Sequence, residues 1–261
     1  MRSEDFRPTT PLVDLVIPTA GGASLALLLA SIDGPPSRLP NHVIVVDCRR
    51  SSRDALSVSA LSPELRALLD VVASPGTNRA AARNVGWQAS RAAWIAFLDD
   101  DVVPCSGWST ELRRDLQAVA PDVAGIRGRV LQPIGTGGSP RDREVDADGR
   151  DVAYRTSALR RLGGFDERLT TVNRDDVDLA LRAERAGLRL VAGRRTVMHP
   201  DWPAGPQSHI HAAWHRLVDA LRDAVPRRRT VTERGSGITI APAPDDDVLQ
   251  RGHRPLGRRC A

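Results

Sequence analysis

The stretch Trp94-Ile-Ala-Phe-Leu-Asp-Asp-Asp101 largely decides the fold of this chain of 261 residues. Its apolar part, bounded on both sides by polar residues, is typical of a buried strand in a parallel sheet. The carboxylates that follow, Asp99, Asp100 and Asp101, would repel one another at the mouth of that strand. A hard cation, Mg²⁺ or Mn²⁺, with diphosphate oxygens as further ligands would relieve this repulsion. The alternative is a solvated acidic turn that caps a helix beginning near Gly107.

Other apolar runs alternate with helical patterns on both sides of this stretch. Strands are predicted over residues 13–18, 42–47, 71–73 and 123–131. Helices are predicted over residues 23–31, 65–70, 79–91 and 107–120, and Asn78 can cap the third of them. Strands that alternate with helices predict an α/β fold, with a mostly parallel, doubly wound central sheet flanked by helices.

The second half of the chain is less regular. A loop rich in glycine, proline and charge is predicted over residues 133–149, and its length indicates a functional or disordered segment. Shorter strands are predicted over 152–155, 188–192 and 196–199, and helices over 176–186 and 206–225. Residues 226–261 contain few apolar side chains, so we expect disorder there.

The composition is that of a globular protein and argues against several classes. The chain is 41% hydrophobic and 26% charged, which is ordinary for a folded domain. No apolar segment approaches the roughly 20 residues that a transmembrane helix needs. The first residues lack an apolar signal core, so we expect a cytoplasmic location. Cys48, Cys105 and Cys260 are odd in number and widely spaced, which fits neither a disulfide framework nor a zinc site.

The basic residues are unusual, because all 37 of them are arginine. Enzymes that depend on a lysine, such as P-loop NTPases and Schiff-base enzymes, are therefore disfavoured. Residues 226–261 carry a net charge of +4 out of +5 for the chain. The remainder is nearly neutral, so a groove for nucleic acid is not indicated. Arg227-Arg-Arg229 follows a predicted amphipathic helix and could contact anionic lipid peripherally, with a solvated tail as the alternative.

Three predicted strands end in polar groups, namely Pro18-Thr19, Asp47 and the acidic triplet. Ligands of open α/β sheets bind outside the carboxyl ends of the strands. A nucleotide there could be held by Asp47 on a base imide and by Thr19 on the ribose, while Arg83 could reach the base or a phosphate. A strand-end carboxylate and a solvated helix arginine are the simpler interpretations. No G-x-G-x-x-G follows the first strand, so a dinucleotide fingerprint is absent.

A second group of carboxylates, Asp175-Asp-Val-Asp178, opens a helix and follows Gly163-Gly-Phe-Asp-Glu167. Acidic residues in a first turn favour the helix dipole, which is one explanation. Asp176 could also remove a proton from an acceptor hydroxyl as a general base. His199 ends the last short strand, where it could join carboxylates around Mn²⁺ or be purely structural.

The ordered set of these segments resembles the family 2 glycosyltransferases. The segments are Asp14-Leu-Val-Ile-Pro-Thr19, Val45-Val-Asp47, Asn78-Arg-Ala-Ala-Ala-Arg-Asn84, Ala96-Phe-Leu-Asp-Asp-Asp101, Gly163-Gly-Phe-Asp-Glu167, Asp175-Asp-Val-Asp-Leu-Ala-Leu-Arg182 and His199. The resemblance covers roughly residues 12 to 200. It implies the GT-A fold, a nucleotide-diphosphate sugar donor, a divalent metal and inversion at the anomeric carbon. The acceptor would be a hydroxyl of a glycan, a lipid-linked glycan or a small molecule.

The same resemblance implies a division of the chain and three groups of site residues. The domain would span residues 1–225, with its nucleotide-binding half over about 12–131 and its acceptor half over about 150–225, followed by the tail 226–261. The metal ligands would be Asp99, Asp101 and His199. The catalytic acids would be Asp176, as the base, and Asp175. The nucleotide-sugar site would contain Pro18, Thr19, Asp47, Arg83, Asp99, Asp100, Gly163 and Gly164.

The chain departs from the family pattern at two places. Asp47-Cys-Arg-Arg50 stands where many relatives have Asp-Asp-Gly-Ser, and Asp175-Asp176 stands where Glu-Asp is usual. These departures motivate a second hypothesis, a non-catalytic member that binds a sugar nucleotide or acts as a scaffold. A sugar nucleotidyltransferase is a third, but such enzymes usually carry a glycine-rich basic loop after the first strand. Thr19-Ala-Gly-Gly22 is too short and uncharged for that loop.

Overall fold

A computed structural model describes most of the chain up to Pro200. The described residues are 11–35, 39–49, 56, 61–74, 76, 78–117, 119–132, 143–145, 149–169 and 174–200. The predicted helix over 206–225, the tail 226–261 and most of the predicted loop 133–149 lie outside these residues. None of the described helices is both long enough and apolar enough to cross a membrane.

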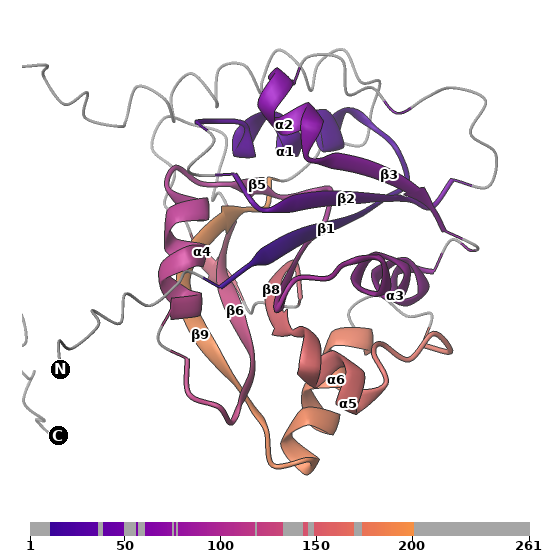
Figure 1. Ribbon diagram of the computed structural model, residues 1–261, viewed down its shortest axis with the longest axis vertical. Helices are drawn as coiled ribbons and strands as arrows, with labels where there is room; N and C mark the ends of the chain where they lie inside the picture. Colours follow the sequence, from indigo (N-terminus) through magenta and orange to yellow (C-terminus); the bar gives the residue numbers. More distant parts are fainter. Residues whose placement is uncertain are drawn as a thin grey trace, which may run out of the picture. The chain divides into compact units, whose positions relative to one another are not determined.

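The described strands form one sheet (Figure 1). They are β1 (Val13–Thr19), β2 (His42–Asp47), β3 (Leu69–Ala73), β4 (Trp94–Leu98), β5 (Val103–Pro104), β6 (Val123–Gln132), β7 (Arg143–Val145), β8 (Asp151–Arg155) and β9 (Arg189–Met198). Their order across the sheet is β3-β2-β1-β4-β8-β6-β9-β5, and β7 pairs with β6. The described helices are α1 (Ala23–Ile32), α2 (Pro63–Ala67), α3 (Arg79–Ala89), α4 (Trp108–Gln117), α5 (Thr156–Leu162) and α6 (Arg174–Arg185).

The sheet is parallel in one half and mixed in the other. Strand β1 runs parallel to β2 and β4, and β2 runs parallel to β3. Beyond β4 the direction changes, because β8 is antiparallel to both β4 and β6. The predicted α/β fold is confirmed, but the sheet is parallel throughout only over its first four strands. The prediction did not anticipate that β8 would enter the sheet between β4 and β6.

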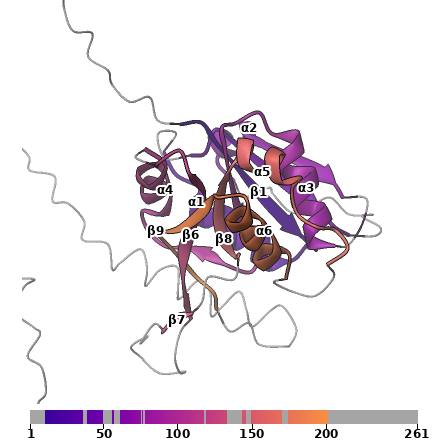
Figure 2. The ribbon, with the colours of Figure 1, turned by 90° about the horizontal axis from the view of Figure 1, so that it is seen from below.

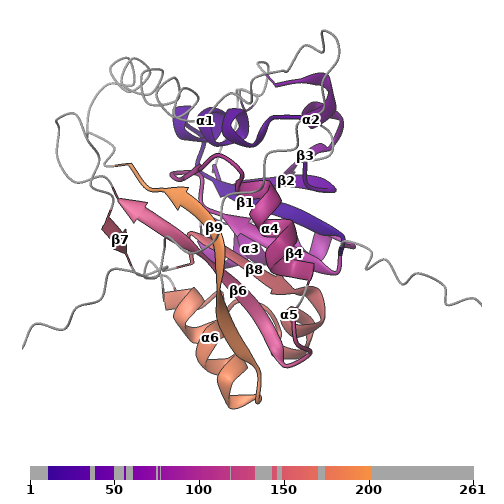
Figure 3. The same ribbon diagram turned by 90° about the vertical axis from the view of Figure 1, so that its left-hand side faces the viewer.

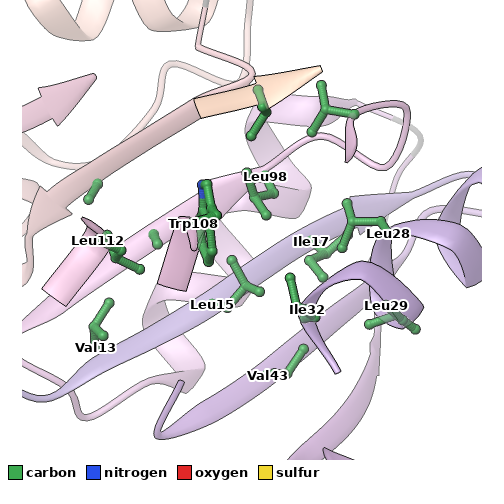
Figure 4. Packing of buried hydrophobic residues seen from close by; sticks show 14 of the residues in the cluster. Val13, Leu15, Ile17, Leu28, Leu29, Ile32, Val43, Leu98, Trp108 and Leu112 are labelled. Atoms are coloured by element: carbon green, nitrogen blue, oxygen red, sulfur yellow. The ribbon is translucent and has the colours of Figure 1, made fainter. Parts of the chain in front are cut away.

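Helices cover both faces of the sheet, and Figure 3 shows α1 and α2 on the side opposite α5 and α6. Alternate residues of β1 point to the two faces, as the two-residue period of a strand requires. Leu15 and Ile17 pack with α1 and α4, in the cluster drawn in Figure 4. Val16 packs on the other face with residues of α3, α5 and α6. Figure 2 shows α5 and α6 side by side on that face.

Helix α3 lies unusually close to the sheet, because Gly86 has no side chain. A Cβ atom at this position would overlap the side chain of Val16 in β1. The helix begins directly after Asn78, whose Oδ1 accepts a hydrogen bond from the Ala80 amide at 2.9 Å. This close packing fixes the first turn of α3 beside the carboxyl ends of β1 and β4, where the candidate site lies.

Two predicted elements differ in extent from those observed. The helix predicted over 65–70 ends at Ala67, and Leu69 already belongs to β3. The two strands predicted over 188–192 and 196–199 are one strand, β9, which has an irregular register against β6. Charged residues interrupt the apolar pattern in its middle, but Arg195 is fully buried there with ionic partners.

Candidate active site

The carboxyl ends of β1 and β4 border a cleft of about 230 Å³. Its lining residues are Pro18, Thr19, Ala20, Cys48, Arg79, Asp99, Asp100 and Asp101. Thr19 lies in register with Asp47 at the end of the neighbouring strand β2. The structure therefore brings together the three strand ends that the sequence analysis expected to meet.

The three carboxylates of the acidic triplet have different partners. Asp100 Oδ2 accepts a hydrogen bond from the Thr19 hydroxyl at 2.5 Å. Asp101 Oδ2 lies 3.2 Å from His199 Nε2, at the end of β9. The two oxygens of Asp99 accept from Arg83 Nη2 at 3.1 Å and pair with Arg79 Nη1 at 3.0 Å. A solvated acidic turn, the simpler interpretation of this sequence, would not have such partners.

Arg83 is the centre of a buried ionic cluster, and its exposed fraction is 0%. It pairs with Asp99, Asp175 and Asp176, and it donates to the carbonyl of Gly149 at 2.7 Å. Its guanidinium carbon also lies 5.8 Å from the ring centre of Phe97 and 5.2 Å from that of Phe165. The side chain of Arg83 therefore lies in the protein interior and does not line the cleft, and its contact with a base or a phosphate stays a prediction.

Arg79 is the arginine that lines the cleft, and the sequence analysis did not single it out. Its side chain is 25% exposed, and Nη2 donates to Asp176 Oδ2 at 2.6 Å. Nη1 pairs with Asp99 Oδ2 at 3.0 Å. The spacing of Arg79 and Arg83 could have revealed it, since residues four apart share a helix face. The cation that can meet a ligand is thus one helical turn before the predicted one.

Asp175 and Asp176 open α6 and are 3% and 6% exposed. The backbone of Gly149 covers the Asp176 carboxylate, and a Cβ atom there would overlap it. Gly149 has a φ of +78°, a conformation that favours glycine. The next carbonyl, that of Arg150, accepts a hydrogen bond from the Asp99 amide at 3.1 Å. Residues 149–150 therefore connect the end of β4 with the carboxylates of α6.

Burial and charge shift the acidity of the cleft residues in different directions. Burial raises the pKa of Asp99 to about 6, although Arg79 and Arg83 favour its ionised form. Burial also raises the pKa of Asp100. Burial disfavours the ionised form of Asp101 as well, but the hydrogen bond and charge of His199 outweigh it and lower the pKa of Asp101. Asp101 therefore stays ionised, as a metal ligand must be.

Asp47 lies at the end of β2, and the side chain of Arg49 is hydrogen-bonded to its carboxylate. Arg49 donates to the carboxylate through Nε at 2.9 Å and through Nη2 at 2.8 Å. This hydrogen bonding lowers the pKa of Asp47. Arg49 is one of the residues in which this chain departs from the family pattern. Both carboxylate oxygens that would meet a base imide are therefore already hydrogen-bonded to this arginine.

Gly163 and Gly164 lie at the end of α5, apart from the residues that line the cleft. Gly164 packs against Asn84 and Trp87 of α3, and its carbonyl accepts from Arg182 Nη2 at 2.8 Å. These contacts join α5, α3 and α6. Their position beneath donor and acceptor stays a prediction, and the contacts of Gly164 are with residues of α3 and α6.

The described residues offer a divalent metal a partial set of ligands. They contain no group of three or more His, Cys, Asp or Glu side chains arranged around one point. Asp101 and His199 lie together, and their oxygen and nitrogen atoms suit Mn²⁺. Both carboxylate oxygens of Asp99 pair with arginines, namely Arg79 and Arg83. The donor set therefore fits a metal whose remaining ligands come from a bound diphosphate or water.

Comparison with curated sequences finds one kind of relative, while no family model matches the chain. The sequence is 32% identical over 206 residues to the pre-mycofactocin glycosyltransferase of Mycobacterium tuberculosis, in strains CDC 1551 / Oshkosh and ATCC 25618 / H37Rv. The match covers 68% of this chain and 40% of the relative. The chain thus spans well under half the length of the curated relatives that it matches.

Comparison with solved structures finds similar folds. GalNAc-T7 with UDP, GalNAc and Mn²⁺ superposes with a TM-score of 0.54 and 13% identity, over 75% of this chain and 45% of that chain. The mannosyltransferase PcManGT from Pyrobaculum calidifontis, in complex with GDP-Man and Mn²⁺, gives a TM-score of 0.47 and 19% identity, over 82% of this chain and 65% of that chain. The first of these similarities confirms the predicted GT-A fold.

Proposed function

Since this chain belongs to the glycosyltransferases with the GT-A fold, we propose that it transfers a sugar from a nucleotide-diphosphate donor to a hydroxyl acceptor. The relationship in sequence confirms the resemblance to glycosyltransferases that the ordered motifs indicated, and it agrees with family 2. The observation that carries the proposal is the convergence of Thr19–Asp100, Asp101–His199 and Arg79 at one cleft.

The donor would lie across the carboxyl ends of β1 and β4. Asp100 and Thr19 would hydrogen-bond the ribose hydroxyls, since their own hydrogen bond already holds them side by side. Asp101 and His199 would hold a divalent metal, and Mn²⁺ in the GalNAc-T7 structure supports that choice. When bound, this metal would supply positive charge to the departing diphosphate. Arg79 would add a second cation on the α3 side of the cleft.

Asp176 would be the general base, with Asp175 beside it to orient Arg83. A single base on the acceptor side and a cation-bound leaving group on the other suit a direct displacement. We therefore propose inversion at the anomeric carbon. Proton removal by a positioned carboxylate typically contributes about 10²–10⁴ to a rate. The positioning of both substrates in the cleft would supply much of the remainder.

Turnover of sugar nucleotides tests the proposal. The released nucleoside diphosphate is measured for a panel of UDP-, GDP- and dTDP-sugars with Mn²⁺, with water as the acceptor where no other is known. We expect turnover of one donor class, strongly lowered in Asp176→Asn and, at limiting Mn²⁺, also lowered in Asp101→Asn. Asp178→Asn is the matched control, because Asp178 lies on the same helix and pairs with Arg182 instead. Nucleotide binding without turnover of any donor would favour the non-catalytic alternative.

We also propose a cytoplasmic location with peripheral contact to anionic lipid through the tail. The support is the sequence alone, where Arg227-Arg-Arg229 follows an amphipathic pattern. Sedimentation with vesicles that contain phosphatidylglycerol tests this for the full chain and for a variant with these three arginines changed to glutamine. Equal sedimentation of the two proteins would contradict the contact.

A further inference from the structure

The proposed base is shielded from the cleft. Asp176 Oδ1 accepts from Arg83 Nη1, and Asp176 Oδ2 accepts from Arg79 Nη2 at 2.6 Å. The backbone of Gly149 covers the carboxylate as well, and the residue is only 6% exposed. A general base needs a lone pair within hydrogen-bond reach of the hydroxyl that it deprotonates. Each oxygen keeps a second lone pair, but Arg79 lines the cleft whereas Asp176 does not, so a hydroxyl in the cleft gains access to Oδ2 when Arg79 turns away.

The two arginines that hold Asp176 differ in their freedom to move. Both pair with Asp99, Asp175 and Asp176. Arg83 is 0% exposed and lies against two aromatic rings, so its displacement would open the packed interior. Arg79 is 25% exposed and borders the cleft together with the acidic triplet. Only Arg79 of the two can turn toward a ligand without opening the core.

A diphosphate in the cleft would compete for Arg79. The planar guanidinium binds phosphate through two parallel hydrogen bonds, and such charge-assisted pairs are strong. Arg79 lines the same cleft as Asp101, the residue proposed to hold the metal. A diphosphate that reaches this metal would therefore also come near the Arg79 side chain.

We propose that Arg79 is a latch that couples donor binding to release of the base. Without donor it holds Asp176 and Asp99, and with donor it turns to the diphosphate and frees Asp176 Oδ2 for the acceptor hydroxyl. This inference rests on the proposed function and deepens it. It makes binding ordered, with the donor first and the acceptor second.

The same movement couples donor binding to acceptor binding. Coupling between two binding events is reciprocal, so a bound acceptor would tighten donor binding by the same factor.

Two measurements on Arg79→Met and Arg79→Lys test the latch, with Arg91→Met as a control at an exposed arginine beyond the end of α3. The first is calorimetric binding of UDP and GDP with Mn²⁺, compared with uridine and guanosine. We expect Arg79→Met to weaken diphosphate binding about tenfold, which is 1.4 kcal/mol, and to leave nucleoside binding unchanged. The diphosphate affinity of Arg79→Lys should be intermediate, because lysine keeps the positive charge but cannot form the two parallel hydrogen bonds of a guanidinium. A purely structural role would weaken both kinds of ligand alike.

The second measurement is carbodiimide labelling of Asp176, followed by mass spectrometry of its peptide. We expect little labelling in the wild type alone, several-fold more with UDP or GDP and Mn²⁺, and high labelling in Arg79→Met under both conditions. If the wild type binds nucleotide but its Asp176 labelling does not change, or if Arg79→Met binds diphosphate normally, the latch is overturned and the proposed function stands. If the wild type binds no nucleoside diphosphate at all, both proposals are overturned.

Discussion

Two arginines among the residues that the structure describes are completely buried, and their surroundings are different. Arg83 joins Asp99, Asp175 and Asp176 beneath the cleft. Arg195 of β9 lies 2.7 Å from Asp151 and 3.1 Å from Asp115, and it donates to the Ile126 carbonyl at 2.6 Å. The indole of Trp108 donates to the second oxygen of Asp151 at 2.7 Å.

The cluster around Arg195 is enclosed by the protein, and we call it the closed cluster. The cluster around Arg83 reaches the cleft through Arg79, and we call it the open cluster. Asp151 and Arg195 are both 0% exposed, and their carboxylate and guanidinium hold β8, β9 and α4 together. The open cluster has a second, partly exposed arginine, Arg79, between its carboxylates and the cleft. Buried ion pairs gain little net stability over apolar packing, yet removing one partner is costly. We therefore expect the closed cluster to fix the arrangement of its strands and helix, and the open one to serve the proposed chemistry.

The two clusters adjoin in sequence. Asp151 begins β8 immediately after Gly149 and Arg150, whose backbone covers Asp176 and receives the Asp99 amide. Asp115 of the closed cluster lies on a separate element, α4.

The largest expected difference between the clusters is in activity. Asp176→Asn should lower turnover about 10²- to 10⁴-fold, because a positioned base is lost. Asp115→Asn removes an acid from the closed cluster and should leave turnover within about threefold at a temperature where it is folded, roughly 0.7 kcal/mol. Donor turnover of both variants, at matched folded fractions, checks this. Equal losses in the two variants would remove the distinction between the clusters.

The next difference is in stability. Arg195→Met leaves Asp151 buried without its counter-ion, and we expect the free energy of unfolding to fall by about 3–5 kcal/mol. Arg194→Met, at the exposed neighbouring position, should change it by less than about 0.5 kcal/mol. Urea unfolding measures both. A small effect of Arg195→Met would mean that the closed cluster is not needed for the fold.

Metal dependence separates Asp101 from a similar pair elsewhere. Asp101→Asn should raise the Mn²⁺ concentration for half-maximal turnover by about tenfold or more, since a charged ligand is lost. His42–Asp70, at 2.8 Å, is a pair of a half-buried histidine and an exposed carboxylate outside the cleft. Asp70→Asn should leave the Mn²⁺ dependence unchanged. A shift of equal size in both variants would argue against a metal at Asp101.

The smallest effect is expected at an exposed ion pair. The side chain of Arg168 lowers the pKa of Asp166 to about 2. A carboxyl with a lowered folded-state pKa adds stability above its unfolded value near 4, and this contribution is lost as the pH falls toward 2. Asp166→Asn should therefore be slightly less stable than the wild type at pH 5, and the difference should narrow at pH 3. Urea unfolding at both values measures it, and a difference that widens at pH 3 would contradict the assignment.

The sequence predicted much of the fold because apolar periodicity is local information. The β1, β2 and β4 strands are continuous apolar runs, so their burial and the meeting of Thr19, Asp47 and Asp99 at one edge could be inferred. The antiparallel entry of β8 next to β4 could not, since strand direction depends on the long connection before it. The pattern also left Arg195 between two predicted strands, whereas it lies buried within β9 and its charge is balanced by residues distant in sequence.

The same limit explains the two arginines of α3. Both fit a polar helix face, and which one is buried depends on Phe97, Phe165 and the acids of α6, which come from other elements. The proposed roles of the carboxylates come from the motif order, but their pairing with arginines could not be predicted from it. Partners across the sheet are visible only in three dimensions.

The central claim is that the cleft at the ends of β1 and β4 binds a nucleoside diphosphate with a metal. Thermal melting of the protein with UDP, GDP, ADP, CDP and dTDP, each with and without Mn²⁺, tests it most directly, because a ligand of the folded state raises the melting temperature. We predict a rise with one nucleobase that is larger with Mn²⁺ and is lost in Thr19→Val and Asp101→Ala. The absence of a rise with any diphosphate and Mn²⁺, or an equal rise in both variants, would contradict the claim.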